Sequence, residues 1–109
     1  MIVNVIHSAL EETPRLVAKV DAGSRSIDDA LEYAYNVTNN LRGSWSQAAE
    51  FTYDKVLVKN LDYNPNVSVL VDLPVRLGKT YGLRSTSMGD QMLVDSKKYK
   101  VDMAGFKEI

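Results

Sequence analysis

Alternation of apolar and polar positions predicts two strands near the start of the chain. Residues 2–7 are rich in Val and Ile. In residues 15–21 the apolar Leu16, Ala18 and Val20 alternate against the charged Arg15, Lys19 and Asp21. This period of two is typical of a strand with one buried face. We therefore expect both segments to be strands, with Leu16, Ala18 and Val20 facing the core.

A period of three to four residues follows and predicts one helix. Ser26 is a favourable N-cap, and Asp29, three residues later, suits the positive end of a helix. Asn39-Asn40 and Gly43 supply residue types that end helices. The prediction is a helix over residues 26–40. Its apolar face follows from the residues that recur every three to four positions, which are Ile27, Ala30, Leu31, Ala34, Val37 or Thr38, and then Leu41 just beyond it.

The second half of the chain returns to strand patterns. Residues 55–59 have strand composition, residues 67–73 alternate, and residues 91–95 and 98–103 predict a hairpin near the end. Residues 47–51 are compatible with a helical turn. The order of elements predicts one α+β domain over residues 1–109, with one main helix packed on a mainly antiparallel sheet.

Composition narrows the function classes. Thirteen basic and fourteen acidic residues nearly cancel, so the chain lacks the concentrated positive charge that makes nucleic acid a probable partner. There is no cysteine, which excludes disulfides and thiolate chemistry. The N-terminus has no secretory pattern, and no segment is apolar enough to span a membrane. We therefore expect a cytoplasmic protein that does not bind membranes.

No cofactor or catalytic constellation is predicted. The sequence contains neither the phosphate-binding loop Gly-x-x-x-x-Gly-Lys-Ser/Thr nor the dinucleotide-binding motif Gly-x-Gly-x-x-Gly. His7 is the only histidine, and no nucleophile or carboxylate stands at a recognisable spacing from it. The acidic pairs Glu11-Glu12 and Asp28-Asp29 are explained by a solvated loop and a helix start. We predict that the protein is not an enzyme and binds no metal.

The C-terminal quarter carries a resemblance to a known family. The run Arg84-Ser85-Thr86-Ser87-Met88-Gly89-Asp90 precedes a predicted hairpin, and Val101-Asp102 and Gly105-Phe106 follow. This order resembles the YodL-type module, whose pattern is close to R-S-x-S-x-G/S-D and then V-D-x-x-G-F. The resemblance covers about residues 83–109, and it departs from the commoner pattern at Met88 and Met103-Ala104.

A weaker resemblance lies upstream, where residues 28–32 and the Gly-Ser-Trp-Ser loop of residues 43–46 are similar to segments of phage proteins that carry this ending. The two resemblances imply a phage or mobile-element protein made inside a bacterial host. They imply no reaction and no catalytic residue.

The Arg84–Asp90 segment admits two interpretations. Its hydroxyls, backbone amides and Arg84 could hold a small anionic ligand such as a nucleotide, because turns of this kind form anion-binding concavities. Alternatively Ser87 caps the turn, Asp90 accepts hydrogen bonds from the backbone of the loop, and Arg84 pairs with a carboxylate elsewhere. The structural alternative is favoured by the absence of a phosphate-binding motif.

Trp45 also admits two interpretations, as an exposed interface anchor or as a side chain that closes one end of the core. With these alternatives open, the sequence favours a binding protein whose partner is a host protein or a second copy of itself, in a role such as host takeover or interference with host defence. The predicted binding surface comprises Trp45, Arg84, Ser85, Thr86, Ser87 and Asp90. A nucleotide-binding module and a nucleic-acid-binding protein are the alternatives.

Overall fold

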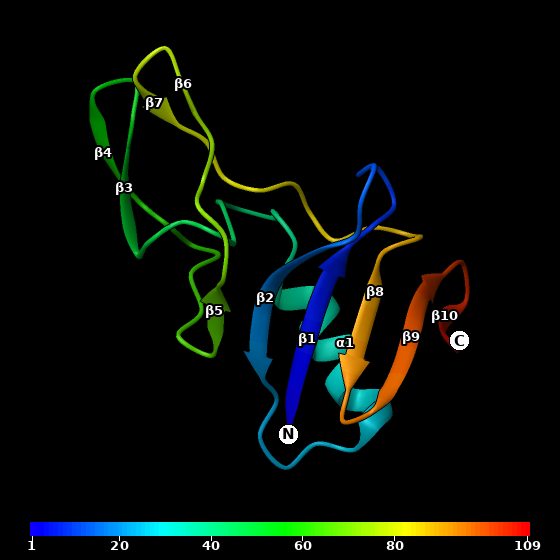
Figure 1. Cartoon of the computed structure of the whole chain (residues 1–109). Coiled ribbons are helices and arrows are strands. Elements are labelled where there is room, and N and C mark those ends of the chain that lie inside the picture. Colours follow the sequence, from blue (N-terminus) through cyan, green and yellow to red (C-terminus); the bar gives the residue numbers. More distant parts are fainter.

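The fold has a body, made of one sheet and one helix, and two small hairpins that project from it (Figure 1). The computed structural model describes residues 1–109. The elements are β1 (Ile2–His7), β2 (Arg15–Asp21), α1 (Ile27–Val37), β3 (Glu50–Tyr53), β4 (Val56–Lys59), β5 (Val67–Val69), β6 (Val75–Arg76), β7 (Lys79–Thr80), β8 (Gln91–Val94), β9 (Lys97–Asp102) and β10 (Gly105–Glu108).

The body contains a six-stranded sheet in the order β10-β9-β8-β1-β2-β5, and all neighbouring strands are antiparallel. The α+β class is therefore confirmed, although the helix is small. The predicted strands over 2–7 and 15–21 are confirmed, and the predicted closing hairpin is formed by β8 and β9. A third strand, β10, extends that hairpin and was not predicted.

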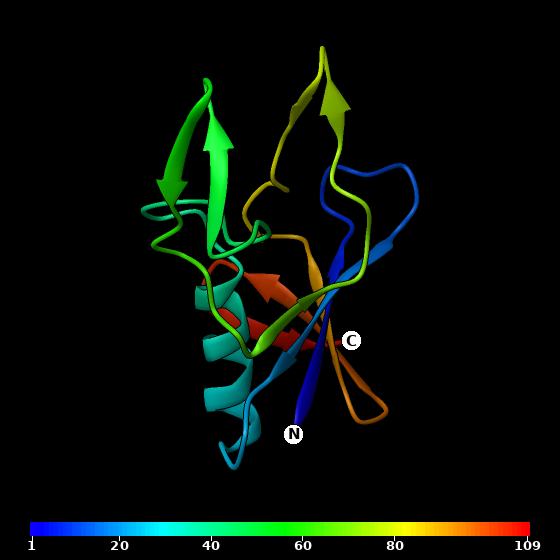
Figure 2. The ribbon, with the colours of Figure 1, turned by 90° about the vertical axis from the view of Figure 1, so that its left-hand side faces the viewer.

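The core lies between α1 and one face of the sheet (Figures 1 and 2). Val3 and Val5 of β1 face Val20 and Ala18 of β2 across the ladder, and all four side chains are fully buried. The helix covers them with Ala30, Leu31 and Ala34. Burying a side chain such as Leu31 contributes roughly 1.5–3 kcal/mol, so this contact holds the helix on the sheet.

The helix is shorter than the predicted 26–40. It begins as expected, because Ser26 Oγ accepts the N–H of Asp29 at 3.3 Å. It ends at Val37, because two side chains take the last carbonyls: Thr38 Oγ1 donates to Ala34 O at 2.7 Å, and the Asn39 amide donates to Tyr35 O.

A β-bulge in β2 overturns the prediction that Leu16 is buried. Val5 pairs with Ala18 but Ile6 pairs with Leu16, so Val17 is an extra residue without a partner on β1. Because side chains alternate between faces, the extra residue places Val17 in the core and leaves Leu16 exposed.

Two predictions in the middle of the chain are also wrong. Residues 47–51 do not form a helical turn, since β3 begins at Glu50 and pairs with β4. The strand predicted over 67–73 ends at Val69. Leu70 N donates one more backbone hydrogen bond to the oxygen of the bulged Val17, and the chain then leaves the sheet toward the hairpins.

Side chains order the loop between α1 and β3. Asp62 Oδ2 accepts the successive N–H groups of residues 41–43 at 2.7–2.8 Å. The Asn60 side chain accepts from Ser44 N, and its amide nitrogen lies within hydrogen-bond distance of three carbonyl oxygens of residues 44–48. The loop that carries Trp45 is therefore held by main-chain hydrogen bonds to two polar residues.

The two hairpins, β3–β4 and β6–β7, stand side by side at one end of the molecule (Figure 2), and together they are called the hairpin arm. They are linked by the ion pair between Lys79 Nζ and Asp54 Oδ1 at 2.9 Å. No helix of the fold has both the length and the apolar character needed to cross a membrane.

Candidate functional site

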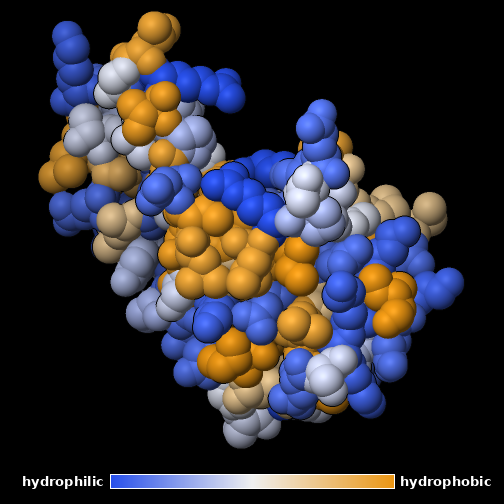
Figure 3. All heavy atoms as spheres, in the orientation of Figure 1, coloured by the Kyte–Doolittle hydropathy of each residue, from blue (hydrophilic) through white to orange (hydrophobic).

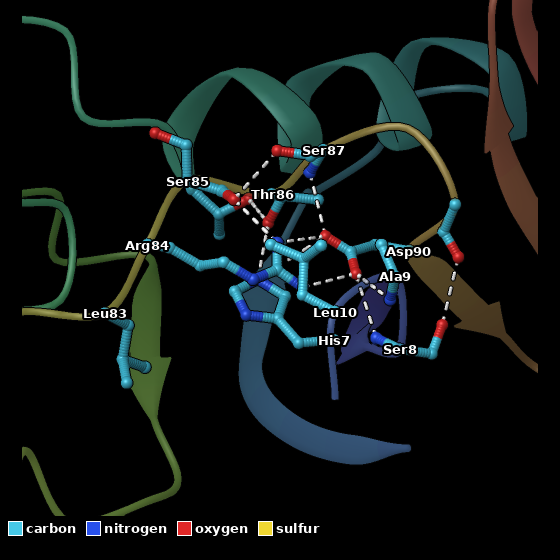
Figure 4. Close-up of polar contacts among 12 residues, drawn as sticks. His7, Ser8, Ala9, Leu10, Leu83, Arg84, Ser85, Thr86, Ser87 and Asp90 are labelled. Atoms are coloured by element: carbon cyan, nitrogen blue, oxygen red, sulfur yellow. Dashed lines mark hydrogen bonds and ion pairs between the residues drawn. The ribbon is translucent and has the colours of Figure 1, made fainter. Parts of the chain in front are cut away.

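The Arg84–Asp90 segment packs against the loop between β1 and β2, at the end of β1 that lies nearest the hairpin arm (Figures 1 and 4). The structure brings together the predicted residues Arg84, Ser85, Thr86, Ser87 and Asp90. It also adds His7 and Glu11.

Asp90 is the centre of this cluster. Its side chain is completely buried, and its two carboxylate oxygens accept three backbone N–H groups, from Ser8 and Ala9 at 2.9 and 3.0 Å and from Ser87 at 2.8 Å. Arg84 donates to both oxygens as well, at 2.7 and 2.8 Å. The concavity formed by these amides is thus filled by a carboxylate of the chain itself.

Arg84 has no donor left for a ligand. A guanidinium carries five N–H groups, and all five are engaged here: two with Asp90, two with Glu11 at 2.8 and 3.2 Å, and one with the carbonyl of Ser85 at 2.9 Å. The structural interpretation of this segment therefore accounts for every N–H group of the Arg84 guanidinium. An external anion would have to displace Glu11 or Asp90.

The electrostatics agree with this closed network. Burial opposes ionisation of Asp90, but the hydrogen bonds from Arg84, Ala9, Ser87 and Ser8 outweigh it and lower the pKa to about 2. The hydrogen bond from Arg84 lowers the pKa of Glu11. The two carboxylates in turn raise the pKa of Arg84, with the Asp90 bond contributing most.

A chain of hydrogen bonds connects His7 to the end of the helix. His7 Nε2 lies 3.0 Å from Thr86 Oγ1, which lies 2.8 Å from Thr38 Oγ1. Thr38 donates its only hydroxyl hydrogen to Ala34 O at 2.7 Å, so it can only accept from Thr86. Thr86 must then accept from His7, which assigns the N–H to Nε2 of the imidazole.

This arrangement differs from that of a nucleophilic triad. A triad needs one histidine nitrogen to accept the proton of the hydroxyl and the other nitrogen to face the carboxylate. Here Nε2 donates to Thr86, and the nearest Asp90 oxygen lies 4.0 Å from the same nitrogen. His7 and Thr86 are also 2% and 1% exposed. The geometry makes His7 a buried structural donor.

Trp45 lies in the core and not on the surface as an exposed interface anchor. It is 2% exposed, its Nε1 donates to Arg84 O at 2.9 Å, and its ring meets His7 edge to face at 6.2 Å. The indole therefore closes the core beside the Arg84–Asp90 segment. The alternative interpretation of Trp45 as a core plug is the one that the structure supports.

Burial also changes the status of the other predicted surface residues. Thr86 and Asp90 are buried, while Arg84, Ser85 and Ser87 are half-buried and bonded within the cluster. Sequence reasoning missed His7, Thr38 and Glu11 as members, because they lie 48 to 79 positions away from their partners on residues 84–86. The one available signal was Arg84, which was expected to pair with a distant carboxylate.

No group of three or more His, Asp or Glu side chains is placed to hold a metal ion. In comparisons with known proteins, no family model, no curated protein and no solved structure matches this chain. The resemblance of residues 83–109 to the YodL-type module therefore stays a hypothesis drawn from the sequence.

Replacing Asp90 tests the structural role of the cluster. Asp90→Asn removes the charge and places an amide N–H₂ against backbone and Arg84 donors, so the buried Arg84 pairing is broken. Loss of one partner of a buried pair costs about 3–5 kcal/mol. Chemical denaturation should show this loss in Asp90→Asn and a change within about 0.5 kcal/mol in the control Asp95→Asn, at an exposed turn. Equal effects would contradict the role assigned to Asp90.

Stability should fall as the pH is lowered, in two windows. Burial lowers the pKa of His7 below its usual 6.5, and the nearby Asp90 only partly opposes this, so the unfolded chain takes up a proton first and stability declines below pH 6.5. Asp90, with a pKa of about 2 against a usual 3.8, contributes about 2 kcal/mol that is lost as the pH falls from about 5 to 2.

His7→Gln separates the two windows. This variant should flatten the dependence of the unfolding free energy between pH 7 and 5 and keep the decline at lower pH. A His7→Gln profile parallel to that of the wild type between pH 7 and 5 would show that His7 is not the titrating group.

Proposed function

We propose that this protein acts by binding another protein through the hairpin arm. The observation that carries the proposal is the number of large apolar side chains that the arm leaves in solvent. They are Tyr53, Val56, Leu57, Val75 and Leu77, of which Leu77 is fully exposed. Figure 3 shows hydrophobic residues among the outermost atoms of the arm, at its upper left.

Exposed apolar clusters of this kind are typical of interaction sites, because a monomer gains nothing from keeping them in water. Tyr53 and Tyr81, both exposed, lie on the arm as well, and aromatic side chains are frequent anchors of interfaces. The arm therefore supplies the partner surface that the sequence had assigned to Trp45 and the Arg84–Asp90 segment.

The arm also has hollows that suit partner side chains. A cleft of about 740 Å³ lies between the two hairpins, lined by residues 51–55 and 77–81. A second hollow of about 400 Å³ adjoins it and shares Phe51, Tyr53 and Tyr81. An apolar side chain of a partner that entered either hollow would bury surface of both molecules.

Only weak interactions connect the two hairpins of the arm to each other. Two-stranded hairpins are marginally stable alone, and the Lys79–Asp54 ion pair that links them is well exposed, with side chains 58% and 70% accessible. Binding a partner would therefore bury the apolar tips and order the hairpins together.

The alternative functions receive less support from the geometry. The nucleotide-binding alternative relied on Arg84, whose donors are all engaged. For nucleic acid, the register places Lys98, Lys100 and Lys107 on the face of the sheet opposite the helix. The aromatic rings of Tyr99 and Phe106 face the helix, so this basic face lacks the stacking surface that single-stranded nucleic acid uses.

The proposal keeps the cellular context that the sequence resemblance implies. The protein would be a small accessory protein of a phage or mobile element, acting in the cytoplasm of a bacterial host, with no catalysis of its own. Its partner would be a host protein or a second copy of the same chain.

Leu77→Asp tests the arm. Leu77 makes no contribution to the core, so the variant should keep the wild-type melting temperature and lose at least about tenfold in affinity for partners captured from bacterial lysate. Leu10→Asp is the matched control, because Leu10 is 79% exposed on the β1–β2 loop. Sedimentation of the purified chain tells a host partner from self-association. Equal capture by wild type and Leu77→Asp would contradict the proposal.

A further inference from the structure

A second groove lies on the body, between α1 and the hairpin formed by β9 and β10, away from the arm (Figure 1). Its volume is about 660 Å³. Its apolar lining includes Tyr35 of the helix, Phe106 of β10, and the exposed Met88 and Met103. Tyr35 and Phe106 meet edge to face at 6.3 Å and form the floor.

The groove runs beside an open edge of the sheet. β10 is the outermost strand and pairs only with β9. Ile109 N donates to Lys98 O at 2.9 Å, so the alternation of an antiparallel ladder turns the N–H and C=O groups of Phe106 and Glu108 away from β9. These backbone groups are free to pair with another strand.

The charge of the groove has one sign. Asp28, Glu32 and Asp102 line it, and no Lys or Arg does. Asp28 and Glu32 lie one turn apart on the helix, and neither forms an ion pair within the chain. An apolar groove with an acidic rim favours an occupant that carries apolar and basic side chains.

We propose that an extended segment of a partner protein adds to β10 as a further strand. Because successive side chains of a strand point to opposite faces, its apolar residues and its Lys or Arg residues take turns at every second position and so share the face that meets the groove. Its backbone pairs with Phe106 and Glu108, its apolar side chains enter the groove, and its basic side chains face Asp28 and Glu32. This mode combines main-chain hydrogen bonds with side-chain pockets. The exposed Met88 and Met103 are flexible and adapt to different apolar side chains.

This site is independent of the hairpin arm. The arm and β10 lie at different ends of the molecule, so both could be occupied together (Figure 1). A chain with two binding sites would bridge two partners.

The test uses two short capped peptides with the repeats Val-Ser-Lys-Ser and Val-Ser-Glu-Ser, in which Val and the charged residue lie on the same face of a strand. These Val-Lys and Val-Glu peptides are titrated into the full chain and followed by backbone amide chemical shifts. The Val-Lys peptide should shift the amides of Phe106, Glu108 and α1 and bind at least about tenfold more tightly than the Val-Glu peptide. Equal binding of the two, or no saturable shift at concentrations on the order of 1 mM, would overturn the proposal.

Two variants locate the contact. Glu32→Lys should weaken binding of the Val-Lys peptide about tenfold. Glu12→Lys makes the same charge change at an exposed position outside the groove, and it should leave the affinity unchanged. Glu108→Pro removes an N–H that the fold does not use, and it should abolish binding while the β9–β10 amides keep their shifts. If both charge variants weaken binding equally, or sedimentation shows a dimer that Glu32→Lys dissociates, the partner-strand proposal fails.

Discussion

The buried carboxylate of Asp90 is the constraint on which this fold depends. It joins the loop after β1, through Ser8 and Ala9, to a segment about 80 positions later that contains Arg84, the turn at Ser87 and Asp90 itself. A charge without water is costly unless every lone pair is used, and here two oxygens accept five hydrogen bonds. The position of the segment that leads into β8 is thereby fixed.

The same constraint shapes our proposal for where partners bind. The polar cluster includes His7, Arg84 and Asp90. Its hydrogen-bond donors and acceptors pair with one another and with the backbone around them. Trp45 seals it from one side. The binding surfaces that we propose lie elsewhere, at the apolar hairpin arm and at the open edge beside β10. Both surfaces suit proteins as partners better than small molecules.

Local patterns predicted local structure well, and long-range contacts account for what they missed. Ser26 and the apolar period located the start of the helix. The Val and Ile content of residues 2–7 and the alternation in residues 15–21 located the central strands. The bulge at Val17 could not be predicted, because one extra residue is visible only in the register between two strands.

The candidate site shows the same limit. The residues of the Arg84–Asp90 segment were found from sequence, since they are contiguous and carry turn chemistry. Their burial was not, because it depends on Glu11, His7 and Thr38, which reach the segment from other elements. The hairpin arm was missed as a surface because its strands are short and have few residues with which to show a period.

The most direct test of this account is a titration of the Asp90 carboxyl carbon by nuclear magnetic resonance in the folded protein. Because five donors hold its charged form, the account predicts a pKa of about 2. A carboxyl that titrates at the ordinary value near 3.8 would show that the network does not hold the charge, and the interpretation of the cluster as the closed centre of the fold would fail.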